Sequence, residues 1–160
     1  MHATESFSAR QVLARCVFPP RPHVVRYARA VIGGIAAEHG FDTYVLATVA
    51  SELVTNAVRH AGGGGAVELW VSIDPEHVCV AVVDQMPLLV LDLSSVGLPD
   101  DDAESGRGLA ILVGVFGAVL ESRTIRGGVA KVVLAKLAHG PLRPADIADS
   151  TMRPSGQSAD

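Results

Sequence analysis

The chain has 160 residues, of which 49% are hydrophobic. This length accommodates one globular domain with a substantial core and leaves little room for a second. Its 13 basic and 17 acidic residues give a net charge of -4, and the absence of a long basic run argues against direct binding to nucleic acid. The first residues, "MHATESFSARQ", lack the apolar core of a signal peptide, and charged or polar residues interrupt every apolar run before membrane-spanning length, so we expect a soluble, cytoplasmic protein. Cys16 and Cys79 stand far apart in apolar surroundings and are expected to be buried thiols rather than zinc ligands.

The first half of the chain predicts one strand followed by two helices. Residues 11–18 alternate and are rich in β-formers, and the prolines after them end the strand. Apolar residues recur at helical spacing over residues 23–39, and Gly40 is a typical stop signal. A second helix is expected over residues 42–61, with Asp42 as its N-cap.

The second half predicts two hairpins separated by a long loop and a short helix. Two β-rich runs at residues 66–84 are joined by a short Pro-Glu turn. Residues 85–108 contain prolines, glycines and an acidic cluster, and such a long loop is usually functional or mobile. A short apolar helix is expected over residues 108–117. The closing hairpin spans residues 118–138 and turns at residues 126–128.

This order of elements predicts an α+β fold. We expect a two-layer sandwich with one mixed, mostly antiparallel sheet and about three helices on one of its faces. The ordered domain is expected to span residues 11–139. Residues 1–10 are interpreted as a flexible N-terminus, and the polar, proline-punctuated residues 140–160 as a disordered tail.

Glu52, Asn56 and His60 stand four residues apart in the second predicted helix. Four-residue steps rotate only about 40° around a helix, so the three side chains share one side. They are either the solvated side of an ordinary helix or part of a site. His60 also fits a helix-end position, where a histidine is favourable at the negative end of the dipole.

Glycines flank two of the predicted helices. The run from Gly62 to Gly65 follows a helix, whose C-terminal end repels phosphate, so a flexible connector is the better interpretation. Gly106 and Gly108 precede a helix, where free backbone N–H groups could hold an anion. Asp84 ends a predicted strand and either starts a turn or accepts a hydrogen bond from the amino group of adenine.

These features in this order resemble the GHKL ATPase superfamily of gyrases, chaperones and sensor histidine kinases. Within it, the sequence is similar to the small anti-sigma-factor serine/threonine kinases of streptomycete type. "SELVTNAVRHA" resembles their N box, "VVDQMP" a shortened G1 box, "DDDAESGRGLAIL" their G2 box and "GVAKVVLAKL" their closing strand. The resemblance covers roughly residues 12–137 and implies the ATP-binding fold of this superfamily, the Bergerat fold.

The resemblance also implies roles for individual residues. Asn56 matches the residue that places an amide oxygen on the Mg²⁺ that bridges the ATP phosphates. Glu52 matches the catalytic base that orients or deprotonates the attacking hydroxyl. Asp84 matches the aspartate that recognises adenine, and the loop after it the ATP lid. The phosphate-contacting segment is matched by Gly106, Arg107 and Gly108.

The function that the resemblance implies is partner regulation by phosphorylation. Proteins of this kind bind a sigma factor and phosphorylate a serine or threonine on an antagonist (anti-anti-sigma) protein, and homodimers are common among them. Two departures favour the alternative of a catalytically weak or inactive binding module. Gln85 and Met86 replace small residues of the G1 box, and Val132 stands where a threonine near the adenine-binding aspartate is usual. A third hypothesis, a metal-dependent hydrolase using Glu52 and His60, lacks a suitably spaced third ligand.

Overall fold

The computed structural model describes residues 10–60, 64–86 and 107–139. Nearly all of the predicted loop, the predicted C-terminal tail and all but one residue of the predicted N-terminal segment lie outside these ranges. The same is true of Gly106, one of the predicted phosphate-contacting residues.

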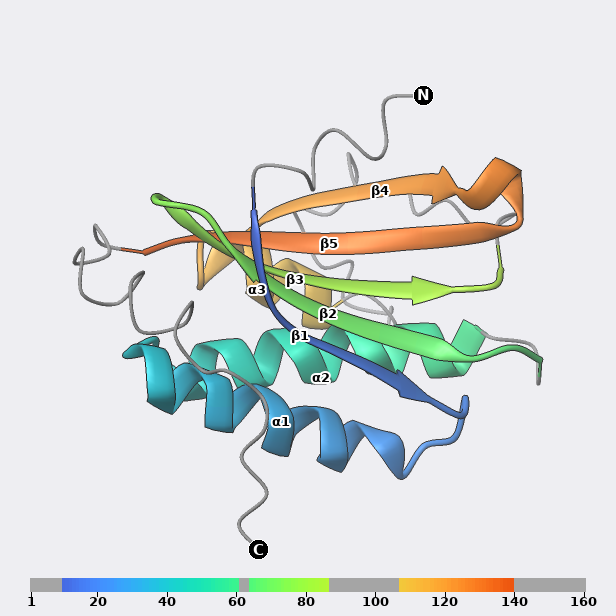
Figure 1. The fold of residues 1–160 in the computed structure, drawn as a ribbon, viewed down its shortest axis with the longest axis horizontal. Helices are drawn as coiled ribbons and strands as arrows, with labels where there is room; N and C mark the ends of the chain where they lie inside the picture. The colour runs from blue at the N-terminus through green and yellow to red at the C-terminus, as the bar shows by residue number, and fades with distance from the viewer. Residues whose placement is uncertain (1–9, 61–63, 87–106, 140–160) are drawn as a thin grey trace, which may run out of the picture.

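The described strands form one five-stranded sheet in the order β1-β2-β3-β5-β4. Every pairing between neighbours in this sheet is antiparallel. The strand β5 therefore lies between β3 and β4, although it is the last strand of the chain (Figure 1). The strands are β1 (Gln11–Phe18), β2 (Val67–Ile73), β3 (His77–Asp84), β4 (Val119–Ile125) and β5 (Ala130–Ala138).

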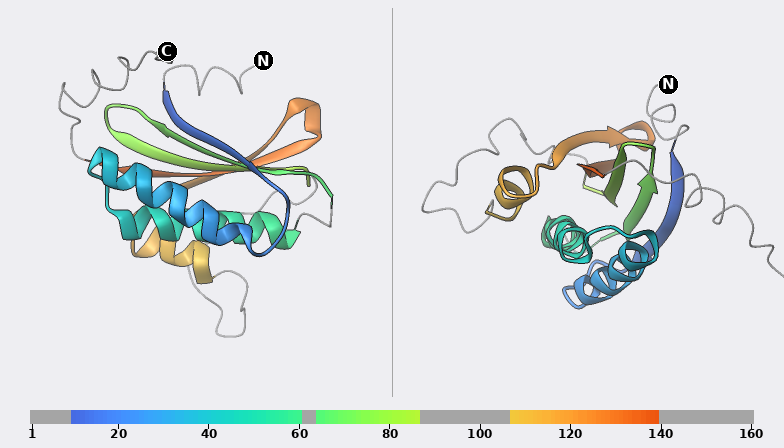
Figure 2. Two further views of the ribbon diagram at one scale, coloured as in Figure 1. Left: turned by 60° about the horizontal axis from the view of Figure 1, so that its bottom comes forward. Right: turned by 90° about the vertical axis from the view of Figure 1, so that its left-hand side faces the viewer.

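Three helices lie on one side of this sheet, which curves around α2 (Figure 2). They are α1 (Val24–His39), α2 (Thr43–His60) and α3 (Arg107–Gly114). The arrangement confirms the predicted two-layer α+β sandwich. Among the described helices, none combines the length and the apolar character that crossing a membrane requires.

Local chemistry explains where the elements begin and end. Asp42 caps α2 as predicted, because its Oδ1 accepts a hydrogen bond of 2.9 Å from the backbone N–H of Val45. The closing hairpin turns through the short 3₁₀ segment η2 (Arg126–Gly128), whose three residues have φ values of 53°, 67° and 88°. Glycine adopts such left-handed backbone without steric cost, which explains the two glycines in this turn.

The core divides between the two faces of the sheet. The inner face packs against the helices, and α2 contacts β2, β3 and β5. Side chains alternate along each strand, so the residues between the inner ones form a second, smaller cluster on the outer face. Inner-face residues include Val78, Val80, Val82, Val133, Ala135 and Leu137. The outer-face cluster consists of Cys79, Ala81, Val83, Ala130, Val132 and Leu134.

The two cysteines differ in their surroundings. Cys79 is buried as predicted, and burial raises the pKa of its thiol above the ordinary value. Cys16, on the edge strand β1, is only partly buried, so the prediction of two buried thiols is wrong for this residue.

Candidate functional site

A pocket opens between α2 and the inner face of the sheet. Its empty space is about 280 Å³ when the part open to solvent is included, and the enclosed room inside it is that of about one water molecule. The apolar side of α2 packs on the sheet, and polar residues next to that side take part in lining the pocket. The lining residues are Leu53, Asn56, Ala57 and His60 from α2, Val82 and Asp84 from β3, and Lys131 and Val133 from β5.

A buried ion pair closes the sheet side of this pocket. Asp84 and Lys131 face each other in the pairing of β3 with β5, and each is only 2% exposed. Lys131 Nζ lies 3.4 Å from Asp84 Oδ2, and the backbone N–H of Met86 donates to Asp84 Oδ1 at 2.9 Å. The buried carboxylate and the buried ammonium thus compensate each other's charge, because an unpaired charge is costly in surroundings of low polarity.

The Glu52 carboxylate lies against the first turn of α3. A methyl group placed on Gly108 would stand 1.8 Å from Glu52 Oε2 and 2.4 Å from its Cδ. A side chain at position 108 would therefore force the Glu52 carboxylate to move, and glycine lets the carboxylate stay against the α3 backbone. Two motifs far apart in the sequence, one on α2 and one at the start of α3, therefore meet in space.

The structure brings most of the predicted site residues together. Asn56 and Asp84 line the same pocket, and Glu52 stands one helical turn before Asn56 on α2. His60, which also fits a helix-end position, lines the pocket as well. Arg107 begins α3.

Val132 does not stand where the sequence analysis placed it. Its register partner is Val83, and both belong to the outer-face cluster. A hydroxyl at position 132 would therefore point away from Asp84 and the pocket. Lys131 occupies the inner position opposite Asp84 instead. Strand alternation could have indicated this lysine, because it is the one charged residue in the run Ala130–Ala135.

The altered G1 residue Gln85 packs away from the pocket. A Cβ placed on Gly65 would stand 2.6 Å from Gln85 Oε1, so the glutamine side chain lies directly over this glycine. Gln85 is exposed and is not among the lining residues. Its side chain therefore leaves the space beside Asp84 open.

Asn56 is one pocket residue whose side-chain oxygen could serve as a Mg²⁺ ligand. Within the described ranges, no group of three or more His, Cys, Asp or Glu residues could hold a metal ion. The side chain of Asn56, a lining residue, carries one amide oxygen. Mg²⁺ is compatible with a single protein ligand, because waters and phosphate oxygens complete its octahedron.

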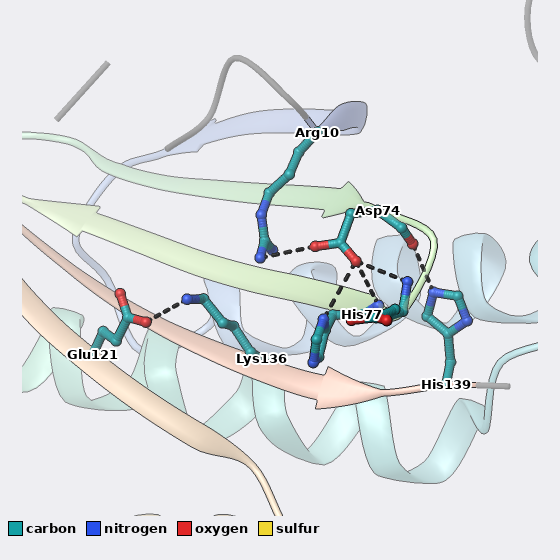
Figure 3. A network of polar contacts seen from close by, with 7 residues as sticks. Arg10, Asp74, His77, Glu121, Lys136 and His139 are labelled. Atoms are coloured by element: carbon teal, nitrogen blue, oxygen red, sulfur yellow. Dashed lines mark hydrogen bonds and ion pairs between the residues drawn. The ribbon is translucent and has the colours of Figure 1, made fainter. Parts of the chain in front are cut away.

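The opposite end of β3 carries a second aspartate-centred network, around Asp74 (Figure 3). Asp74 Oδ1 accepts hydrogen bonds from the backbone N–H groups of Glu76 at 2.9 Å and His77 at 2.7 Å. Arg10 NH2 lies 3.0 Å from Oδ2. Partial burial raises the pKa of Asp74, but the two backbone hydrogen bonds and the charges of Arg10 and His77 outweigh it and leave the pKa below the usual value. This network fixes the turn between β2 and β3.

A sequence model of the histidine kinase-like ATPase domain family matches residues 18–136. The match covers more than half of the chain, and the chain therefore belongs to this family. A search of curated proteins gave no significant match.

Two solved structures were found to be similar to this chain. A chain in the crystal structure of the SiaB–SiaC complex from Pseudomonas aeruginosa is similar with a TM-score of 0.57 and 12% sequence identity, over 85% of this chain and 95% of that one. The catalytic domain of histidine kinase ThkA gives a TM-score of 0.49 and 14% identity, over 81% of this chain and 99% of that one. At such low identity, the first likeness concerns the fold alone.

Proposed function

We propose that this protein binds ATP with Mg²⁺ in the pocket between α2 and the sheet and acts as a serine/threonine protein kinase of the anti-sigma type. The observation that carries the proposal is that Asn56 and Asp84, from separate elements, line one pocket. Membership of the histidine kinase-like ATPase family supports the same nucleotide.

Each residue has a task in this proposal. The Asp84 carboxylate accepts a hydrogen bond from the adenine amino group, which is a donor. Asn56 would hold Mg²⁺, which neutralises charge on the phosphates. Glu52 takes the proton of the attacking hydroxyl, whose oxygen bonds to the γ-phosphorus as the bond to the bridging oxygen breaks and ADP leaves. The proposed phosphate contacts come from Gly106, Arg107 and Gly108.

The proposed partners are a sigma factor, which the protein sequesters, and an antagonist protein, which it phosphorylates. The resemblance to the anti-sigma kinases motivates both, together with a homodimer as the assembly. The similarity to a chain that was crystallised as part of a two-protein complex agrees with a regulator that works through a protein partner.

Transfer from labelled ATP tests the proposal. The wild-type protein, incubated with Mg²⁺ and candidate antagonist proteins, is expected to label a serine or threonine of one of them. Asn56→Ala and Glu52→Gln should reduce this transfer by two orders of magnitude or more, because positioning and charge neutralisation supply most of the catalysis. Arg59→Ala is the matched control, since Arg59 is an exposed residue on the same helix outside the pocket lining. Transfer that survives Asn56→Ala unchanged would refute the metal role.

A second candidate is a binding module on the same fold that sequesters a partner without phosphoryl transfer. The buried Asp84–Lys131 pair favours it, because Lys131 engages the carboxylate that would otherwise be free to accept adenine. Calorimetry separates the two candidates. Micromolar affinity for ATP together with transfer supports the kinase, whereas sequestration of a sigma factor without ATP binding supports the module.

A further inference from the structure

Lys131 is a lysine inside a pocket rather than at a surface. It is 2% exposed and lines the pocket beside Asp84. Lysine is almost never this buried unless its charge has a partner. Its partner here is the carboxylate proposed to recognise the base, so the ammonium group stands where the edge of a bound base would come.

The pair has hydrogen-bonding capacity beyond its internal contacts. An ionised carboxylate offers about four lone-pair sites, and Asp84 uses them toward the N–H of Met86 and the ammonium of Lys131. The Lys131 ammonium has three N–H donors, and its contact with Asp84 engages one of them. The pocket therefore presents an acceptor and a donor side by side.

Adenine carries the complementary pattern. Its amino group is a donor, and each ring nitrogen beside that group is an acceptor. Val82 and Val133 stand two residues from Asp84 and Lys131 on the same strands and line the same pocket. Their apolar side chains suit the flat, apolar faces of a purine.

We propose that Lys131 is a second base-reading residue: its ammonium group donates a hydrogen bond to a ring nitrogen of adenine, next to the amino group whose hydrogen bond Asp84 accepts. This inference rests on the proposed ATP site and deepens it. The lysine then has two roles, because it compensates the Asp84 charge when the site is empty and orients the base when it is occupied.

Deaza analogues of ATP test the contact on the wild-type protein. The two relevant analogues replace N1 or N7, the ring nitrogens beside the amino group, by C–H, whereas 3-deaza-ATP changes a remote position. Calorimetry in Mg²⁺ should show that 1-deaza-ATP or 7-deaza-ATP binds at least about tenfold more weakly than ATP, because a hydrogen bond from a charged donor is lost. The affinity for 3-deaza-ATP should equal that for ATP.

Substitutions test whether Lys131 makes the hydrogen bond that the deaza analogue lacks. Lys131→Met should bind ATP at least about tenfold more weakly and should no longer distinguish ATP from the sensitive analogue. Lys136→Met is the matched control, because Lys136 lies on the same strand, pairs with Glu121 and is outside the pocket lining. It should bind all four nucleotides like the wild type.

The outcomes separate this inference from the proposed function. Wild-type protein that binds no ATP would overturn the proposed ATP site itself. ATP binding with equal affinities for ATP, 1-deaza-ATP and 7-deaza-ATP would overturn only the role of Lys131. Tighter ATP binding by Lys131→Met would also overturn it, since the lysine would then block the base. The comparison of analogues on wild-type protein remains decisive if Lys131→Met does not fold.

Discussion

The two ends of β3 each carry a buried or partly buried aspartate, and the two aspartates have different surroundings. Asp74, in the turn before β3, is engaged by two backbone N–H groups, Arg10 and His77 (Figure 3). Asp84, the last residue of β3, has one backbone N–H and Lys131 as partners and lines a pocket. Both carboxylates are compensated, but of the two only Asp84 lines this pocket.

One residue type thus serves structure at one place and, in the proposed ATP site, recognition at another. Three of the four partners of Asp74 come from its own turn or hairpin, so its hydrogen bonds hold local geometry. The Asp84 carboxylate can still accept hydrogen bonds beyond those from its two partners, and one of these partners, Lys131 on β5, is a donor beside it. We expect substitutions at the Asp74 end to change stability alone, and substitutions at the Asp84 end to change stability and ligand binding together.

The largest effect is expected from Asp84→Asn. The change leaves the Lys131 ammonium without its compensating charge, and breaking one side of a buried ion pair costs about 3–5 kcal/mol of unfolding free energy. ATP affinity should fall by at least about a hundredfold, since both base contacts depend on this carboxylate. Urea unfolding and calorimetry at neutral pH measure the two effects. Asp74→Asn is the control, and an equal loss of ATP affinity in that variant would contradict the comparison.

Gly108→Ala extends the comparison to the α3 side of the site. The added methyl group would overlap the Glu52 carboxylate and displace it, and a misplacement of about 1 Å in a catalytic group can reduce the rate roughly a hundredfold. Phosphoryl transfer should fall by about that factor. The matched control is Gly114→Ala at the other end of α3, where an added Cβ would meet no atom within 4 Å. Full activity in Gly108→Ala would show that Glu52 needs no fixed position.

Asp74→Asn should lower the unfolding free energy by about 1–2 kcal/mol at pH 7, because charge-assisted hydrogen bonds are weakened. The pKa of Asp74 is lowered in the folded protein, so its contribution is complete above the unfolded value of about 3.9 and is lost as the pH falls through the folded value. Urea unfolding at pH 7 and near pH 3 should show a difference between variant and wild type that shrinks in acid. A difference independent of pH would refute the electrostatic account.

The smallest effect is expected from Arg10→Met. Asp74 keeps both backbone hydrogen bonds in this variant, so the loss should be below about 1 kcal/mol, as for ion pairs near a surface. ATP affinity should equal that of the wild type, because Arg10 lies at the other end of the sheet from the pocket. Thermal unfolding and calorimetry check both statements. A loss larger than that in Asp74→Asn would mean that Arg10 acts through contacts other than this carboxylate.

Much of the architecture could be predicted from local patterns. Asp42 and Gly40 mark helix ends that the structure places within a residue of the prediction, because caps depend on neighbours in the chain. The turn at residues 126–128 was likewise predicted from its glycines. The site was predictable only in part. Asn56 and Asp84 belong to motifs in which the resemblance gives them a role, whereas Lys131 lies in the motif of the closing strand without such a role. His60 also fits a helix-end position, and its place in the pocket lining was not predicted.

The amino-acid sequence by itself determined the order of the elements, the capping of α2 and the residue types that can carry phosphoryl-transfer chemistry. Only the tertiary structure decided that Lys131 rather than Val132 faces Asp84, and that Glu52 rests on Gly108. The physical reason is that side chains alternate along a strand, so a shift of one residue in the pairing of β3 with β5 exchanges the two faces. Such a register depends on contacts between distant segments, and no local pattern specifies it.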